Sequence, residues 1–339
     1  MSRIHFLNVD EGDCSIIEHE NGKVTMIDIC CGNIEQDEIR KSFSIMEGLG
    51  GIKGNFGQKE HPTNPISYLN RNVINTIFRY IQTHPDMDHM DGLSELNRTK
   101  SILNFWDTEN NKEQDFDENG KVRGYLKKDW DCYQKLRKSA SDPKALFYYD
   151  GTKNKYFAED DNGILRDDYI QILSPTKELI DAANKLGDWN DSSYVLLYYT
   201  HGFKVLFCGD ADMGTINHLL ENHKQEISNI DVLIAPHHGR DSDKDFSFLD
   251  VMKPQITLMG NAKSKFLAYD EWSNRGLSHI TNNQAGNILI EFEEGSMYIS
   301  ISNKVFADNF CQSQWKQNSS QHGTLKDYWR LGLMKNKKL

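Results

Sequence analysis

The chain has 339 residues, of which 38% are hydrophobic and 26% charged, and its formal net charge is −11. This length allows one large domain or two ordinary ones, because domains usually contain about 50–250 residues. No run approaches the ~20 apolar residues that span a bilayer, and the acidic balance argues against a nucleic-acid coat protein of the usual basic kind.

Two features of the sequence predict a cytoplasmic protein. The N-terminal segment reaches the acidic residues Asp10 and Glu11 too early for a secretion signal. The six cysteines show no C-x-x-C spacing, so the sequence suggests neither a disulfide framework nor a zinc finger. We therefore expect buried free thiols in a reducing compartment.

Short apolar runs separated by turn signals predict β-strands in the first quarter of the chain. The expected strands are 6–9, 14–17, 24–29 and 77–81. Asp28 lies in the third of them, where its carboxylate can brace a nearby loop. Residues 33–72 form a polar insertion whose glycines match no nucleotide-binding pattern. We expect a surface loop there, and a lid over the site is the alternative.

The stretch 83–89, with the sequence THPDMDH, follows the strand 77–81 and contains two imidazoles and two carboxylates. An extended segment points every second side chain the same way. His84, Asp86 and Asp88 can therefore converge, while His89 faces a neighbouring point. This arrangement suits a pair of metal ions held close together, and the alternative is a polar turn with two surface histidines.

The rest of the chain alternates strands and helices. Residues 107–168 look like a second insertion, with a helix at 129–138. Further strands are expected at 102–106, 169–173, 194–199, 204–208, 231–235 and 256–259, with a closing hairpin at 287–292 and 296–302. Further helices are expected near 93–96, near 216–220, and from 174 to 183 with a proline at the first helical position.

Three of these strands end in residues that can bind metals. The stretch 83–89 follows one strand, Asp210 ends another, and His237 and His238 follow a third. Each group alone is unremarkable, because a strand-end Asp is usually a cap and a His pair usually lies at the surface. Such distant residues meet only if the strand ends share one edge, and together they form the pattern of a dinuclear metal centre.

Six motifs together resemble the metallo-β-lactamase fold, and specifically the branch typified by the C-terminal domain of the ComEC/Rec2 competence proteins. The motifs are FLNVDEGD at 6–13, MID at 26–28, THPDMDH at 83–89, NDSSYVL at 190–196, LFCGD at 206–210 and PHHG at 236–239. They span roughly residues 4–302, and the set is far more specific than any single member.

Several positions depart from the family pattern. Asp86 replaces the second histidine of the superfamily's H-x-H-x-D-H motif, as it does in the ComEC branch. The histidine of the third motif is absent, and Asn190 and Ser193 occupy that region. Cys30 and Cys31 stand where a glycine is usual. The channel helices are missing, so DNA import is not implied.

The resemblance implies an α/β fold, an αββα sandwich of two mixed β-sheets with helices outside and the site at one edge. It also implies two divalent metal ions. The ligands of the first ion would be His84, Asp86 and Asp210. The ligands of the second would be Asp88, His89, His238 and a bridging Asp210. Mn²⁺ is favoured because carboxylates prefer harder ions, with Zn²⁺ or Mg²⁺ as alternatives.

The remaining roles follow from this ligand set. Asp88 would orient the attacking water, and His237 would be catalytic or face the phosphate, although the roles of the two neighbouring histidines can be reversed. A substrate phosphate would contact the polar and basic residues nearest the motifs. These are Asn190, Ser193, Arg240, Lys263 or Lys265, of which the last three are chosen from position alone.

The predicted domain organisation is a hydrolase domain at 1–303, with insertions at 33–72 and 107–168, followed by a basic tail at 304–339. The tail carries seven Lys/Arg against two acidic residues, a net of +5. Its aromatic residues can stack on bases. The alternative is a helix packed on the domain, with Trp329, Leu331 and Leu333 buried.

We therefore expect a metal-dependent phosphodiesterase, most simply a nuclease with DNA as its nucleic-acid partner. A second hypothesis, favoured by the acidic body, is a hydrolase of a small substrate such as a cyclic nucleotide, lactone or thioester. A third is a non-catalytic partner protein that keeps the fold without full metal occupancy, favoured by the missing third-motif histidine. No membrane partner is expected, and a protein partner or homo-oligomer is left open.

Overall fold

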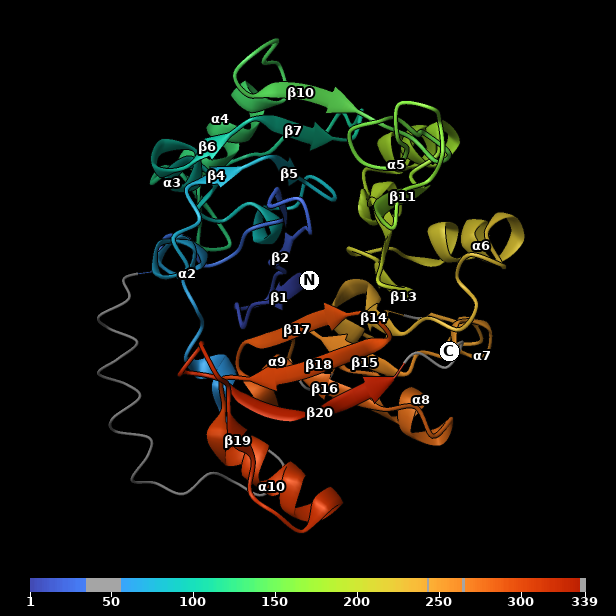
Figure 1. Cartoon of the computed structure of the whole chain (residues 1–339). Coiled ribbons are helices and arrows are strands. Elements are labelled where there is room, and N and C mark those ends of the chain that lie inside the picture. Colours follow the sequence, from blue (N-terminus) through green and yellow to red (C-terminus); the bar gives the residue numbers. More distant parts are fainter. Residues whose placement is uncertain (35–55, 243, 264–265, 336–339) are drawn as a thin grey trace.

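Two large β-sheets pack face to face in this computed structural model, with helices on both outer faces (Figure 1). The structure describes residues 1–34, 56–242, 244–263 and 266–335. The architecture is the predicted αββα sandwich of two mixed β-sheets, so the predicted α/β fold class is confirmed.

The first sheet has ten strands in the spatial order β10-β7-β5-β3-β2-β1-β17-β18-β20-β19. It is mixed, because β3, β5, β7 and β10 are paired in parallel and the other neighbours are antiparallel. The strands are β1 Ser2–Phe6, β2 Ser15–Glu18, β3 Val24–Ile27, β5 Arg79–Ile81, β7 Asn104–Asp107, β10 Lys144–Phe147, β17 Ile288–Glu293, β18 Ser296–Ile301, β19 Ser320–Gln321 and β20 Trp329–Lys335.

The second sheet has six strands in sequence order, antiparallel from β11 to β13 and parallel from β13 to β16. Its strands are β11 Asp168–Ser174, β12 Val195–Thr200, β13 Phe203–Phe207, β14 Val232–Ile234, β15 Ile256–Met259 and β16 His279–Thr281. Two small sheets pair β4 Thr76–Ile77 with β6 Ser101–Ile102, and β8 Lys121–Val122 with β9 Tyr125–Leu126.

Helices bury the outer face of each sheet. On the first sheet lie α2 Pro65–Arg71, α3 Leu93–Thr99 and α4 Lys127–Leu136. On the second lie α6 Met213–Asn222, α7 Phe248–Met252 and α8 Tyr269–Asn274. The other helices are α5 Lys177–Leu186, α9 Asn282–Ala285, α10 Lys304–Trp315 and the 3₁₀ turns η1 Gln58–Glu60, η2 Met87–His89, η3 Asn190–Ser192 and η4 Pro236–Gly239. None of the helices in the described ranges is long and apolar enough to cross a membrane.

The central core lies between the two sheets. Apolar side chains of both inner faces form one buried cluster, for example Ile4 and Phe6 from β1 and Val205 and Phe207 from β13. Because strand side chains alternate between the two faces, intervening residues of β13 such as Leu206 pack outward against the helices. This packing fixes the two sheets relative to each other, and with them the strand ends from which the loops at one edge begin.

Four sequence-based boundaries need correction. The strand predicted at 6–9 is β1 Ser2–Phe6, so residues 7–9 belong to the loop that leads toward the site. Pro175 does not start a helix, because Thr176 is the N-cap and its hydroxyl accepts the Leu179 N–H. The apolar runs 77–81 and 102–106 each divide into two short strands.

The C-terminal segment is integrated in the first sheet through β20, which pairs antiparallel with β18. The packed-helix alternative is wrong for 329–335, which form a strand: Leu331 is buried, whereas Leu333 is 47% exposed. Tyr328 is also buried, and its hydroxyl lies 2.9 Å from that of Tyr68. Tyr328 therefore cannot stack on a base in this conformation.

The two insertions contribute regular structure as well. Much of the first lies outside the described residues, but η1 and α2 belong to it. The second adds β10 to the edge of the first sheet and α4 to its outer face.

Candidate metal centre

The ligand-type residues meet because three strands end at the same edge of the sandwich. Residues 83–89 follow β5, Asp210 follows β13, and residues 237–238 follow β14. The strands β13 and β14 are parallel neighbours, so their carboxyl ends lie side by side. Two backbone hydrogen bonds hold the loops together: Tyr194 N to Thr83 O at 3.0 Å, and His237 N to Gly209 O at 2.9 Å.

Four imidazoles surround the carboxylate of Asp210. Its Oδ1 lies 3.3 Å from Nε2 of His89 and 3.5 Å from Nε2 of His238. Its Oδ2 lies 3.9 Å from Nε2 of His84 and 3.5 Å from Nε2 of His237. Each carboxylate oxygen thus faces two imidazole nitrogens, as a carboxylate between two metal ions would.

Several buried polar atoms of this cluster lack a hydrogen-bond partner. Nε2 of His84, His89 and His238 and Oδ1 of Asp210 are buried and have no hydrogen-bond partner among the described residues. A buried polar atom without a partner costs about 1–3 kcal/mol. Asp88 completes one donor set with His89 and His238, whose ligand atoms all lie within 4.8 Å of one another. These residues therefore fit divalent metal ions.

The backbone at the third strand end adopts an unusual conformation. His237 and His238 both lie in the left-handed region, with φ of 51° and 58°. Non-glycine residues in strained conformations of this kind cost of order 1–3 kcal/mol each. The turn allows both Nε2 atoms to reach Asp210. Gly239 follows with φ of 84°, and a Cβ there would lie only 3.1 Å from the sulfur of Met259.

Asp28 fixes the orientation of His89 from behind. It accepts hydrogen bonds from the Thr83 N–H at 2.8 Å and the Thr83 hydroxyl at 2.6 Å, and its Oδ2 lies 2.8 Å from Nδ1 of His89. Since a carboxylate only accepts, Nδ1 of His89 carries a proton, and Nε2 faces the centre, where its lone pair would bind a metal ion. The predicted bracing role of Asp28 is confirmed.

Asp13 plays the same part for His238, and the sequence analysis missed it. Its Oδ1 lies 3.1 Å from Nδ1 of His238. Gly260 packs against this pair, because a Cβ there would meet Asp13 Oδ1 at 2.9 Å. The signal was present, since Asp13 ends the opening motif, but nothing in the sequence placed that turn beside His238.

The segment from His84 to Asp88 is not extended throughout, contrary to the sequence-based prediction. Residues 87–89 form the 3₁₀ turn η2, which breaks the alternation. Oδ2 of Asp86 lies 4.0 Å from Nε2 of His84, while Oδ1 binds Nζ of Lys112 at 2.5 Å. The Lys112 ammonium also lies 5.0 Å from the centre of the Trp189 ring. Lys112 comes from the insertion 107–168, and no sequence signal pointed to it.

The charges at this edge shift the pKa values of its groups in different directions. Burial lowers the pKa of His89 and His238, but the neighbouring carboxylates outweigh it and raise both. Burial raises the pKa of Asp210, but the surrounding imidazoles outweigh it and hold the pKa well below the usual range. Burial lowers the pKa of His84 and of His237 to about 4. Both imidazoles are therefore neutral near pH 7, the form in which a histidine binds a metal. Burial also raises the pKa of Asp88.

The predicted substrate-binding residues have different surroundings. Ser193 is buried beside Gly209, and its hydroxyl oxygen has no partner among the described residues. Asn190 is half-buried at the start of η3. The cations of Arg240 and Lys263 each lie 3.7 Å from Glu11, so their charges are partly compensated. Lys265 lies outside the described residues.

Asp191, within the same motif, has a structural role. Its carboxylate accepts the backbone N–H groups of Asp212, Gly214 and Thr215 at 3.1, 3.1 and 2.8 Å. It therefore holds the first turn of α6 immediately after Asp210.

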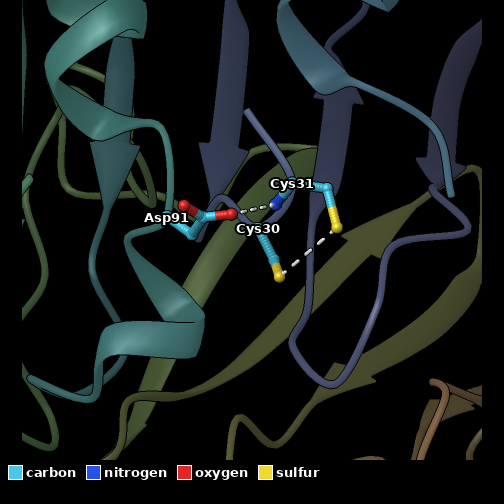
Figure 2. A group of neighbouring side chains, drawn as sticks. All are labelled: Cys30, Cys31 and Asp91. Atoms are coloured by element: carbon cyan, nitrogen blue, oxygen red, sulfur yellow. Dashed lines mark hydrogen bonds between the residues drawn. The ribbon is translucent and has the colours of Figure 1, made fainter. Parts of the chain in front are cut away.

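The two adjacent cysteines follow β3 and lie beside Asp91 (Figure 2). Their sulfur atoms are 3.7 Å apart, and the Cys31 N–H donates to Asp91 at 3.0 Å. A Cβ on Gly12 would lie 2.8 Å from Cβ of Cys30 and 2.0 Å from the carbonyl oxygen of Asp88, so the three backbones pack closely. The hydrogen bond with Cys31 and burial raise the pKa of Cys30, which stays a thiol. All six cysteines are free, as expected.

Comparison with known proteins concerns the fold. No family model and no curated protein sequence matches this chain. Among solved structures, Igni18, a metallo hydrolase from the archaeon Ignicoccus hospitalis, is 12% identical with a TM-score of 0.45, covering 86% of this chain and 100% of its own. A diphosphatase of the PhnP family is 12% identical with a TM-score of 0.42, covering 86% and 98%. The short form of human tRNase Z is 11% identical with a TM-score of 0.38, covering 78% and 95%.

The fold and the site together define an αββα sandwich with a candidate metal centre at its edge, the architecture that the resemblance to the metallo-β-lactamase fold implies. Asp210 lies at the middle of that centre, and the two sheets contribute the loops around it.

Proposed function

We propose that this protein is a metal-dependent hydrolase that cleaves phosphodiester bonds, with DNA as its substrate. The observation that supports this best is the pair of donor sets on the two oxygens of Asp210. When bound, two divalent ions would supply Lewis acidity toward water and toward the attacking and leaving oxygens of a phosphate.

The residues divide into two sides in this proposal. His89, His238 and Asp88 would hold one ion with Oδ1 of Asp210. His84 would hold the other with Oδ2, together with Oδ2 of Asp86. We assign His237 to this second side, because its Nε2 faces Oδ2 of Asp210 as that of His238 faces Oδ1. His237 would then replace the missing third-motif histidine.

Asp88 is our choice for the group that accepts a proton from the attacking water. Its carboxylate belongs to the donor set at the centre, and burial raises its pKa, which makes it a better base near neutral pH. Ser193, Asn190 and Arg240 would position the phosphate, since they lie at the neighbouring strand ends and turns.

Hydrolysis of a small substrate is the second candidate. The net charge of −11 opposes long polyanions, and Glu11 partly neutralises two cations near the site. The two functions are separated by incubating metal-loaded protein with plasmid DNA, with bis(p-nitrophenyl) phosphate, and with lactone and thioester reporters. Release of nucleotides from DNA, lost in His238→Gln, supports the nuclease. Turnover of the lactone or thioester alone contradicts it.

The metal dependence gives a further prediction. The three carboxylates Asp86, Asp88 and Asp210 favour harder ions than an all-imidazole site would. After removal of metals with a chelator, Mn²⁺ is expected to restore more phosphodiesterase activity than Zn²⁺. Full activity of a zinc-only sample, unchanged by added manganese, would reject this preference.

Lys112→Met is expected to raise KM for a phosphodiester about tenfold and to change kcat little. The substitution removes an ammonium group that lies beside Asp86 and Trp189. A charge-assisted hydrogen bond from this group to a substrate phosphate would contribute about 1.5–3 kcal/mol to binding. Initial rates with bis(p-nitrophenyl) phosphate measure the effect. Lys135→Met, at an exposed position of α4, is the matched control, and equal KM values for the two variants would show that Lys112 does not contribute to phosphodiester binding.

A further inference from the structure

A second cluster of metal-binding side chains lies on α6 and on the loop after β10. Oδ2 of Asp150 lies 3.1 Å from Nε2 of His218 and 2.9 Å from Nε2 of His223. These three ligand atoms all lie within 4.8 Å of one another. Asp210 precedes the N-terminus of α6, whereas His223 is its C-cap, about 15 Å further along the helix axis. The cluster is therefore separate from the candidate centre.

We propose that Asp150, His218 and His223 form an independent binding site for one divalent metal ion, and that zinc fits it best. Two imidazole nitrogens and one carboxylate oxygen are ligands that Zn²⁺ accepts. In a tetrahedral zinc site the ligand atoms are ~3.3 Å apart, given bonds of about 2.0–2.2 Å. The distances of 2.9 and 3.1 Å need only a small expansion.

Hydrogen bonds within this cluster leave one of its ligand-type atoms without a partner. Both imidazoles direct Nε2 at the same carboxylate oxygen, whereas Oδ1 of Asp150 is buried without a partner among the described residues. A metal ion bound by both oxygens would use the atom that the histidines leave unpaired. It would also replace two protons that compete for one acceptor.

The surroundings suit a cation with access to solvent. The three side chains are 12–20% exposed, which leaves a path for the ion and for a water ligand. Glu226 and Glu178 act electrostatically on His223 and His218, respectively, and add negative charge nearby.

The site would connect the second insertion to the helix that follows Asp210. The loop of Asp150 is already anchored by backbone hydrogen bonds, from Asp150 N to Pro175 O at 2.9 Å and from Gly151 N to Ile172 O at 3.2 Å. A metal ion there would fasten this loop to the C-terminal half of α6. The expected role is structural, and a gain in stability should accompany binding.

The test counts zinc in the full-length protein after loading with Zn²⁺ and desalting. The double variant His218→Gln/His223→Gln is expected to contain one zinc fewer per chain than wild type, and to hydrolyse its substrate at the wild-type rate. His279→Gln, which changes a half-buried histidine that stacks on Tyr269, is the matched control and should keep the full count.

A second background separates this site from the candidate centre. In Asp210→Asn/His238→Gln, one zinc per chain should remain and should raise Tm. Adding His218→Gln/His223→Gln to that background should remove both the zinc and the rise in Tm. Asp150→Asn, which keeps the side-chain shape, should do the same if the histidine variants fail to fold. Equal zinc content with and without the cluster would overturn the proposal, whatever the protein hydrolyses.

Discussion

Asp210→Ala is expected to lower kcat/KM about 1,000-fold or more while the fold survives. Both oxygens of this carboxylate face imidazoles from two different loops, so its removal disrupts both donor sets at once. The fold should persist because Asp191 and the N-cap Asp212 hold the following helix independently of Asp210. Hydrolysis rates, metal content and circular dichroism measure the three parts of this expectation.

The same argument predicts how substitutions combine. His89→Ala should be nearly as damaging as Asp210→Ala, and the double variant should be little worse than either, because groups that act as a unit are not additive. Asp245→Ala provides the control, since this exposed carboxylate hydrogen-bonds only to Ser247 within the described part of the chain. Activity of Asp210→Ala within a few-fold of wild type would remove Asp210 from the centre.

The placement of the centre was predictable because it depends on strand ends. Asp210 and the pair at 237–238 follow parallel neighbours, β13 and β14, and parallel neighbours present their carboxyl ends at one edge. A run of apolar residues that stops at a ligand-type residue therefore predicts position as well as chemistry. The αββα class follows from the same motifs taken together.

The sequence could not show contacts that depend on how distant loops pack. Lys112 reaches Asp86 from the second insertion, and Asp13 reaches His238 from a turn 225 positions earlier. The alternation of side chains expected for an extended segment was also wrong for residues 87–89, which form the turn η2. In the C-terminal segment, the prediction relied on the number of cations and overlooked the alternating pattern of β20. In that strand Leu331 is buried and the neighbouring positions are more exposed.

Replacements of Asp28 are expected to separate protein stability from metal binding. Asp28→Ala removes the acceptor of three donors: the Thr83 N–H, the Thr83 hydroxyl and Nδ1 of His89. Each buried donor left unpaired costs about 1–3 kcal/mol. Alanine also tolerates the backbone φ of 56° at this position less well than aspartate does. We expect a loss of about 3 kcal/mol or more in the free energy of unfolding, measured by urea denaturation.

Asp28→Asn is expected to keep most of this stability and still lose the metal. The amide oxygen can accept the Thr83 N–H, and one hydrogen of the amide NH₂ can be donated to the Thr83 hydroxyl oxygen. The amide NH₂ must then donate to Nδ1 of His89, which moves the ring proton to Nε2. That proton would point at Oδ1 of Asp210, 3.3 Å away, where the lone pair of a metal ligand is needed.

The two variants are therefore expected to differ in stability, although both bind metal more weakly than wild type. Asp28→Asn should melt close to wild type but bind Mn²⁺ or Zn²⁺ about 10–100-fold more weakly, since partners behind a metal ligand have effects of this size. Asp28→Ala should lose both stability and metal binding. Glu20→Gln, in an exposed carboxylate on the loop before β3, is the control and should change neither. Wild-type metal affinity in Asp28→Asn would show that Asp28 does not set the protonation of His89.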